Sequence, residues 1–136
     1  MVGADGQGEI VKVMFYGKHL NLSFIDIREV VDCTLNCLIS KDFSTIAYRG
    51  HSGAIVGPAI AYLLEKNLVL IRKEENAHSA SKIEGKLQGK YVIIDDFIDT
   101  GETVSDILRT LGERNCIGIF LYDTQTFLTV KSFRGR

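Results

Sequence analysis

The chain has 136 residues, enough for one domain with a substantial hydrophobic core but too few for two independent domains. Its 16 basic and 17 acidic residues give a net charge of -1, so no overall field attracts nucleic acid or an acidic membrane surface. Any bound anion must therefore be held by local groups. We predict a single domain over residues 1–136, with neither nucleic acid nor a membrane as partner.

We find neither a targeting signal nor a cysteine spacing typical of disulfide or zinc sites in the sequence. The start, MVGADGQGE, lacks the basic and apolar stretches of a secretory signal, and no run of about 18 apolar residues could span a bilayer, so we expect a cytoplasmic location. Cys33, Cys37 and Cys116 lack the spacing of a disulfide framework or a zinc site. Cys33 and Cys37 lie four residues apart on a predicted helix, and we expect both to pack in the core.

Strands and helices are predicted to alternate along the chain. A helix is expected to begin near Ser23 or Asp26, and Pro58 is expected in the first turn of another. Strands that are apolar on both faces argue for a mostly parallel sheet flanked by helices. The expected strands are 9–16, 44–48, 68–72, 90–95, 116–122 and one within 126–136, which ends in a basic tail; the expected helices are 24–40, 58–66 and 104–113.

Two glycine-bearing loops, 49–57 and 96–103, are predicted to leave strand ends, and the long polar segment 73–89 lies between them. In open α/β sheets, ligands bind outside the carboxyl ends of the strands, so these loops are expected to meet in one crevice. In the second loop, backbone N–H groups and the hydroxyls of Thr100 and Thr103 are expected to point into one concavity that suits a phosphate.

Two adjacent acids, Asp95 and Asp96, stand just ahead of this predicted phosphate loop. Two carboxylates do not suit a site for a bare anion. They suit a site for a ribose 5-phosphate, because carboxylates accept hydrogen bonds from sugar hydroxyls while the turn holds the phosphate. Gly101 would permit the tight turn. The alternative is an ordinary strand-to-helix turn in which the two acids only cap N–H groups.

The segment VIIDDFIDTGET, residues 92–103, resembles the signature of the type I phosphoribosyltransferases. The similarity extends outward: residues 47–96 resemble, in order, the pyrophosphate-binding loop, its helix, the next strand and the flexible catalytic loop of the orotate and adenine branches. RKE, a following His78 and IEG are most similar to the orotate branch. The resemblance covers about residues 44–122 and implies the family's α/β fold, here with a minimal hood over the site.

The resemblance implies that a nitrogenous base displaces pyrophosphate from 5-phosphoribosyl 1-pyrophosphate in the presence of Mg²⁺. Asp95 and Asp96 would hold the ribose hydroxyls and the metal, largely through water, as Mg²⁺ allows. The residues that match the 5-phosphate loop are Thr100, Gly101, Glu102 and Thr103, and the candidates for binding pyrophosphate are Arg49, Gly50, His51, Ser52 and Gly53. In this family the latter loop often carries a strained or cis peptide.

Four further residues match catalytic positions of the family. Arg72, Lys73 and His78 lie at or within the long loop, where cations would stabilise the departing pyrophosphate; the alternative is a solvated basic edge. Asp99 precedes Thr-Gly as in the hypoxanthine-guanine branch, where the matching acid accepts a proton from the base. This match places a purine slightly ahead of orotate as the acceptor. The resemblance also implies a homodimer.

The sequence departs from the family pattern in three ways. Asn76 stands where the orotate branch has a second loop lysine, and Glu102 stands where a small residue is common. The hood that would recognise the base is short, and its aromatic candidates are Phe15, Tyr16, Tyr122 and Phe127. Two other readings stay open: a non-catalytic regulator that binds phosphoribosyl pyrophosphate or a nucleotide, and a generic doubly wound domain with accidental loops.

Overall fold

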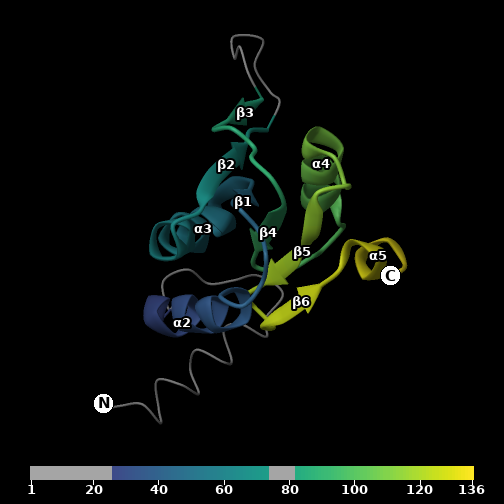
Figure 1. Ribbon diagram of the computed structural model, residues 1–136. Coiled ribbons are helices and arrows are strands. Elements are labelled where there is room, and N and C mark those ends of the chain that lie inside the picture. The colour runs from purple at the N-terminus through teal and green to yellow at the C-terminus, as the bar shows by residue number, and fades with distance from the viewer. Residues whose placement is uncertain (1–25, 74–81) are drawn as a thin grey trace.

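The computed structural model describes residues 26–73 and 82–136, which form one six-stranded sheet with helices on both faces (Figure 1). The strand order is β3-β2-β1-β4-β5-β6, in which β2, β1, β4 and β5 are parallel and the two edge strands are antiparallel to their neighbours. The predicted mostly parallel sheet is confirmed. The strands are β1 (Thr45–Tyr48), β2 (Asn67–Ile71), β3 (Ile83–Glu84), β4 (Tyr91–Asp95), β5 (Cys116–Leu121) and β6 (Thr126–Leu128); the helices are α2 (Ile27–Leu38), α3 (Gly50–Leu64), α4 (Glu102–Leu111) and α5 (Val130–Arg134).

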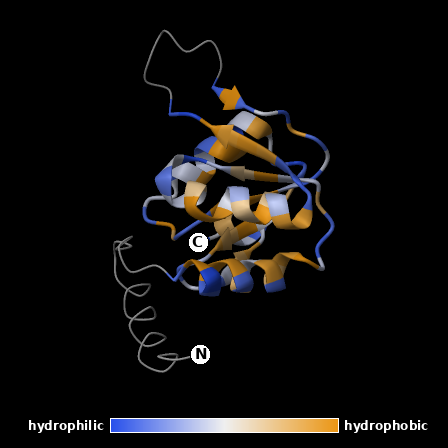
Figure 2. Cartoon of the chain, turned by 90° about the vertical axis from the view of Figure 1, so that its left-hand side faces the viewer, coloured by the Kyte–Doolittle hydropathy of each residue, from blue (hydrophilic) through white to orange (hydrophobic). Residues whose placement is uncertain are grey.

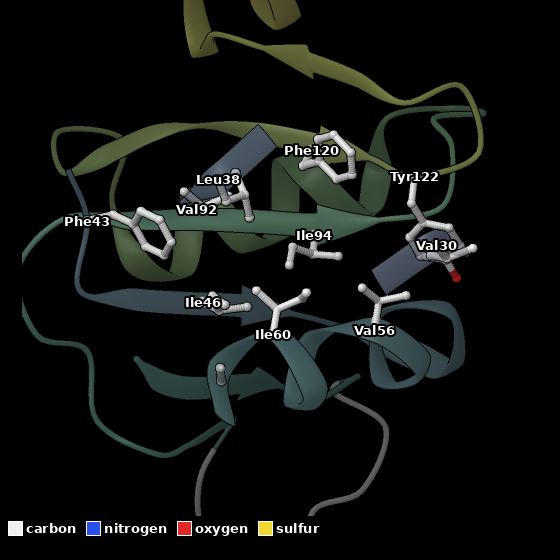
Figure 3. Packing of buried hydrophobic residues seen from close by; sticks show 11 residues of the cluster. Val30, Leu38, Phe43, Ile46, Val56, Ile60, Val92, Ile94, Phe120 and Tyr122 are labelled. Carbon is white, nitrogen blue, oxygen red and sulfur yellow. The ribbon is translucent and has the colours of Figure 1, made fainter. Parts of the chain in front are cut away.

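Alternate residues of the central strands supply two separate layers of the core. Ile46, Ile94 and Phe120 face α2 and α3, whereas Ile93 and Ile119, one residue away along their strands, face α4 and α5. Figure 3 shows the first layer, in which the labelled side chains of the sheet meet those of the two helices. Figure 2 shows hydrophobic colour along the strands and hydrophilic colour in the loops and on outward helical turns. Burial on both sides explains why these strands read as continuous apolar runs.

Helix α2 begins where the sequence predicted, at the second of the two candidate caps. The side chain of Asp26 accepts hydrogen bonds from the backbone N–H groups of Arg28 (3.1 Å) and Glu29 (3.4 Å). Cys33 and Cys37 pack against the buried cluster, as expected. The other candidate start, at residue 23, lies outside the described residues, as does the predicted strand 9–16.

The start of α3 corrects the predicted boundaries. This helix begins at Gly50, so residues 50–57 are helical rather than a loop, and Pro58 lies in the helix interior, where it leaves one intrahelical hydrogen bond unmade. The glycines that suggested a loop instead allow close packing: a Cβ atom on Gly53 would lie 2.6 Å from the Cβ atom of Tyr48, and one on Gly57 would lie 3.3 Å from the Tyr48 ring. Small residues there let the helix approach β1.

The C-terminal segment is also more regular than predicted. After the expected strand β6, Thr129 caps the short helix α5 by accepting a hydrogen bond from the Ser132 N–H (3.1 Å). Phe133 of this helix is buried in the α4 layer of the core, so the segment is packed at this residue, while its basic residues Lys131, Arg134 and Arg136 are exposed as predicted for a basic tail. Within the predicted polar loop 73–89, the two-residue strand β3 was not expected; it pairs with the edge of β2. In the part of the chain described here, no helix is long and apolar enough to cross a bilayer.

Candidate functional site

A cavity of about 280 Å³ lies at the carboxyl ends of the neighbouring parallel strands β1 and β4. Helix α3 starts directly after β1, and helix α4 starts a few residues after β4, so the first turns of both helices form walls of the cavity. This is the place where open α/β sheets bind ligands. The residues that line it are Arg49, Gly50, His51, Ser52, Lys73, Asp95, Asp96, Phe97, Ile98, Asp99, Thr100, Gly101, Glu102, Thr103 and Val104.

The α3 wall combines the positive end of a helix with a cation. Arg49 occupies the N-cap position of α3, and within the described residues no side chain caps the first N–H groups of this helix. Gly50 has φ +87°, a conformation that residues with a Cβ atom rarely adopt. The described residues contain no cis peptide bond, so the cis form that the family resemblance suggested for this loop is not found among them. Unpaired N–H groups at a helix start favour an anion.

The α4 wall begins at Gly101, which has φ +87° and occupies the N-cap position. The hydroxyl of Thr100 accepts a hydrogen bond from the Glu102 N–H at 3.2 Å. The guanidinium of Arg136 lies over Gly101, where a Cβ atom would come within 1.8 Å of its Nη2 atom, and it also stacks 4.5 Å from the centre of the Phe133 ring. The missing side chain of Gly101 therefore permits the turn and leaves room for the Arg136 guanidinium at this helix start.

Asp95 and Asp96 form the floor of the cavity and are each 8% exposed. Asp95 accepts a hydrogen bond from the Asp96 N–H (2.9 Å), and Asp96 accepts from the Phe97 N–H (2.8 Å) and from the Ser52 hydroxyl (2.9 Å). Burial, together with the adjacent Asp96, raises the pKa of Asp95 well above its ordinary value. Each acid makes short local hydrogen bonds, yet both still border the cavity.

A third acid, Asp123, follows β5 and lies close to this pair. It is 6% exposed, its backbone N–H donates to the Asp96 carbonyl at 2.9 Å, and its Oδ1 atom is buried without a hydrogen-bond partner among the described residues. Burial and the negative charge of Asp96 raise the pKa of Asp123 to about 6. Three carboxylates at adjacent strand ends make this part of the site strongly acidic.

Most of the residues predicted for the site are brought together, two are not, and one lies outside the described residues. Arg72 does not line the cavity; its guanidinium pairs with Glu84 on the neighbouring strand β3. Gly53 lies beneath the cavity, against Tyr48, and serves helix packing. His78 lies outside the described residues, and so does Asn76. The other predicted residues line one continuous surface.

The structure adds residues that the sequence reading missed. Phe97, Ile98 and Val104 line the cavity, and they were overlooked because an apolar residue inside a signature carries no obvious chemistry. The buried Asp106 of α4 pairs with cations from three places in the chain. The sequence contained one signal for Asp106: an acid on the apolar face of a predicted helix needs a cationic partner when it is buried.

The comparisons with known proteins agree with this geometry. No protein-family model matches the chain. The adenine phosphoribosyltransferase of Pseudomonas aeruginosa is 32% identical over an alignment of 111 residues, and the match covers 65% of this chain and 59% of that enzyme. That of Pseudomonas syringae pv. tomato is 29% identical over 108 residues, 62% of this chain and 58% of that enzyme. The chain thus spans less than two thirds of these relatives' length.

Solved structures match most of the described fold. The adenine phosphoribosyltransferase of Thermoanaerobacter pseudethanolicus has a TM-score of 0.58 at 21% identity, over 82% of this chain and 84% of that one. The Mycobacterium tuberculosis orotate phosphoribosyltransferase in complex with phosphoribosyl pyrophosphate has a TM-score of 0.58 at 15% identity, over 88% and 75%. These structures show that the chain has the fold of the phosphoribosyltransferases, and the similarity to the Pseudomonas enzymes agrees with the resemblance to the type I family. Within this phosphoribosyltransferase-like chain, the hypoxanthine-guanine-like role of Asp99 stays a prediction.

Proposed function

We propose that this chain transfers the 5-phosphoribosyl group of phosphoribosyl pyrophosphate to a nucleobase and releases pyrophosphate. The observation that carries the proposal is the cavity itself: two helix starts and the buried pair Asp95–Asp96 face one space. A sugar with a phosphate at each end needs this combination of two anion sites with hydroxyl acceptors between them. The proposed unit is the domain 1–136, acting as a homodimer.

In the proposed complex, the 5-phosphate lies at the start of α4. There it accepts hydrogen bonds from the backbone of Gly101, Glu102 and Thr103 and from the hydroxyls of Thr100 and Thr103, all of which border the cavity. The ribose hydroxyls donate to Asp95 and Asp96. The pyrophosphate lies at the start of α3, near the backbone of residues 50–52 and the guanidinium of Arg49.

The residues at the α3 end would act on the chemical step. Positive charge grows on the ribose as its bond to pyrophosphate breaks, and negative charge grows on the leaving group, so donors that face pyrophosphate are worth most in the transition state. Lys73 and Arg49 line that end, and His51 lies beside them. His78 is proposed for the same role from its sequence position, whereas the pairing of Arg72 with Glu84 leaves Arg72 outside the cavity lining.

The donor set also fits Mg²⁺. Asp95 and Asp96 offer carboxylate oxygens beside the predicted place of the substrate's phosphates, and no cluster of three ligating side chains occurs in the described residues, as suits an ion held largely by water and substrate. When bound, Mg²⁺ would neutralise charge on the pyrophosphate. The chain's own part is to hold the two carboxylates in place, aided by the hydrogen bonds that Asp96 accepts.

A purine, with adenine first, is the proposed acceptor because the similar Pseudomonas enzymes are adenine phosphoribosyltransferases. Asp99 is exposed at the cavity edge, where it could accept a proton from the base, and Phe97 offers an aromatic face in the lining. Tyr122 is not free to stack a base, because it is buried in the core and donates its hydroxyl hydrogen to the Ser52 carbonyl at 2.8 Å. Phe127 packs against the same core.

The test is pyrophosphate release from phosphoribosyl pyrophosphate and Mg²⁺ with adenine, guanine, hypoxanthine, xanthine, uracil and orotate in turn. We expect release with a purine, and release with orotate alone would overturn the choice of acceptor. If no base gives pyrophosphate release while calorimetry detects binding of phosphoribosyl pyrophosphate, the chain is a regulator that binds this ligand without turnover. If nothing binds, the proposed function is wrong. Sedimentation of the same sample tests the homodimer.

A further inference from the structure

Asp106 of α4 is a buried acid that contacts three cations. It is 5% exposed. Its Oδ1 atom accepts hydrogen bonds from the Lys82 ammonium (2.9 Å) and the Arg109 guanidinium (2.8 Å), while its Oδ2 atom lies 3.6 Å from Nη1 of Arg49. These partners come from the start of β3, from the same helix and from the end of β1. One carboxylate thus joins three elements around the cavity.

The Arg49 side chain is the partner that lines the cavity. It is 14% exposed, and its Nε atom is buried without a hydrogen-bond partner among the described residues. A buried guanidinium N–H that lacks an acceptor is costly. An anion in the adjoining cavity would relieve that cost, and the single negative charge of Asp106 is shared among three cations, so the group stays positive overall.

Arg49 also has carboxylates on its other side. The charge of Arg49 opposes the rise in the pKa of Asp95 that burial causes, and Asp95 and Asp96 border the same cavity. A long side chain with this choice of partners would move between them, because arginine has many rotamers of similar energy. Contact with Asp106 selects one of these arrangements before any ligand arrives.

We propose that Asp106 is a positioning residue that fixes the Arg49 guanidinium at the α3 end of the cavity, where it binds the pyrophosphate group of the substrate. This inference rests on the proposed function and names one residue that positions the cation for pyrophosphate binding. Pre-organisation of the cation lowers the ordering cost of binding. An i,i+3 pair between Asp106 and the exposed Arg109 alone would contribute little, so the buried contacts carry the effect.

Calorimetry with three ligands separates positioning from simple stability. Wild type, Asp106→Asn and the control Asp42→Asn are titrated in Mg²⁺ with phosphoribosyl pyrophosphate, inorganic pyrophosphate and ribose 5-phosphate. The control removes the charge of an exposed acid that pairs with Lys90 at 3.5 Å. We expect Asp106→Asn to weaken binding of the two pyrophosphate-bearing ligands about tenfold, the typical loss of one charged hydrogen bond, and to change ribose 5-phosphate binding less than about twofold.

A double-mutant cycle tests whether the effect runs through Arg49. Arg49→Gln should weaken pyrophosphate binding at least as much as Asp106→Asn, and the double variant should be no worse than Arg49→Gln alone. If Asp106→Asn does not fold, Asp106→Glu keeps the charge but moves it by one methylene, and a smaller loss confined to the same two ligands is expected.

The outcomes separate the two proposals. If wild type binds phosphoribosyl pyrophosphate but Asp106→Asn binds all three ligands as wild type does, or loses all three equally, the positioning role is wrong while the proposed function stands. Additive losses in the double variant would also overturn the role. If wild type binds none of the ligands, both proposals fail.

Discussion

The two helix starts that face the cavity carry opposite charges. At the start of α3 stand Arg49 and His51, with Lys73 nearby, whereas at the start of α4 stand Asp99 and Glu102, with Asp95 and Asp96 close behind. Both starts offer backbone N–H groups to an anion, so the backbone alone would make them equivalent. The side chains make one end suited to a doubly charged leaving group and the other to a sugar phosphate with its hydroxyls.

This difference teaches that the cavity is polarised along its length. The cations lie where charge would leave during the proposed reaction, and the acids lie where charge would stay constant or grow positive on the ribose. The cationic end is stabilised internally through Asp106, while at the acidic end burial and then neighbouring like charges raise the pKa of Asp95 and Asp123. The variants below disturb one end at a time.

The largest effect is expected from the double variant Asp95→Asn with Asp96→Asn. Loss of two charged acceptors should weaken binding of phosphoribosyl pyrophosphate at least about 100-fold, since each hydrogen bond to a charged group contributes about 1.5–3 kcal/mol. Binding of inorganic pyrophosphate should weaken less, because the two acids would reach that ligand only through Mg²⁺. Calorimetry measures both, and equal losses for the two ligands would contradict the polarised cavity.

At the other end, Lys73→Ala should slow the chemistry more than it weakens binding. Lys73 is exposed and lines the cavity, so it can reach a leaving pyrophosphate without holding the fold together. We expect kcat with the best base to fall at least about tenfold, because donors aimed at developing charge act mainly in the transition state, while KM for phosphoribosyl pyrophosphate changes less than about threefold.

The matched control is Lys90→Ala, which removes an exposed lysine that lies outside the cavity lining. Its kinetic constants should stay at wild-type values. A rise in KM with unchanged kcat in Lys73→Ala would assign Lys73 to ground-state binding instead.

The α4 end could be predicted from the sequence almost completely, and the α3 end only in part. The run 92–103 places its chemistry in one continuous segment, so a local pattern contained the strand, the acids and the turn. At the α3 end, Gly50, Gly53 and Gly57 looked like a loop, because a sequence does not show that two of them face Tyr48 and permit close helix packing. The local composition therefore predicted which residues line this end of the cavity, but it predicted a loop where the structure has a helix.

The contacts that no local pattern contains were also missed. Asp106 pairs with Lys82, 24 residues earlier, and with Arg49 at the end of another strand. Tyr122 was a candidate base-stacking residue until the fold placed it beneath Ser52, to which it donates a hydrogen bond 70 residues away. Such pairings depend on the strand order of the sheet, which is determined by packing of the whole core and not by any local segment.

Glu102→Gln tests the acid within the predicted phosphate loop, whose charge would repel a bound phosphate. Glu102 is exposed and lines the cavity at the predicted phosphate end. Removing its charge should strengthen binding of phosphoribosyl pyrophosphate about two- to fivefold, the effect of one exposed like charge. The same change should lower the free energy of unfolding by about 0.3–1 kcal/mol, because an acid in the first turn favours the helix dipole.

Opposite signs for affinity and stability are the distinguishing result for Glu102. Calorimetry gives the affinity, and urea unfolding gives the stability. Weaker binding in Glu102→Gln would show that the acid holds a ligand group or the metal rather than repelling the phosphate.

The smallest expected effect is a pH dependence of stability at the acidic end. Burial and Asp96 raise the pKa of Asp123 to about 6, above its unfolded value, so the folded state binds the proton more tightly. Stability from this residue is therefore present at low pH and is lost as the pH rises through about 6. Asp123→Asn removes that loss, and the variant should gain on the order of 1 kcal/mol over wild type between pH 4.5 and pH 8.

Asp106→Asn provides the comparison of opposite sign. Burial acts to raise the pKa of Asp106, but its hydrogen bond to Lys82 and the charges of Lys82 and Arg49 outweigh burial and lower it. Its stabilisation is present above the unfolded pKa and is lost as the pH falls, so Asp106→Asn should lose stability relative to wild type as the pH rises from about 3 to 6. Urea unfolding of both variants across this range measures the two slopes. Slopes of the same sign would mean that the two ends of the cavity are not electrostatically opposed, and the division between a cationic leaving-group end and an acidic ribose end would fall with them.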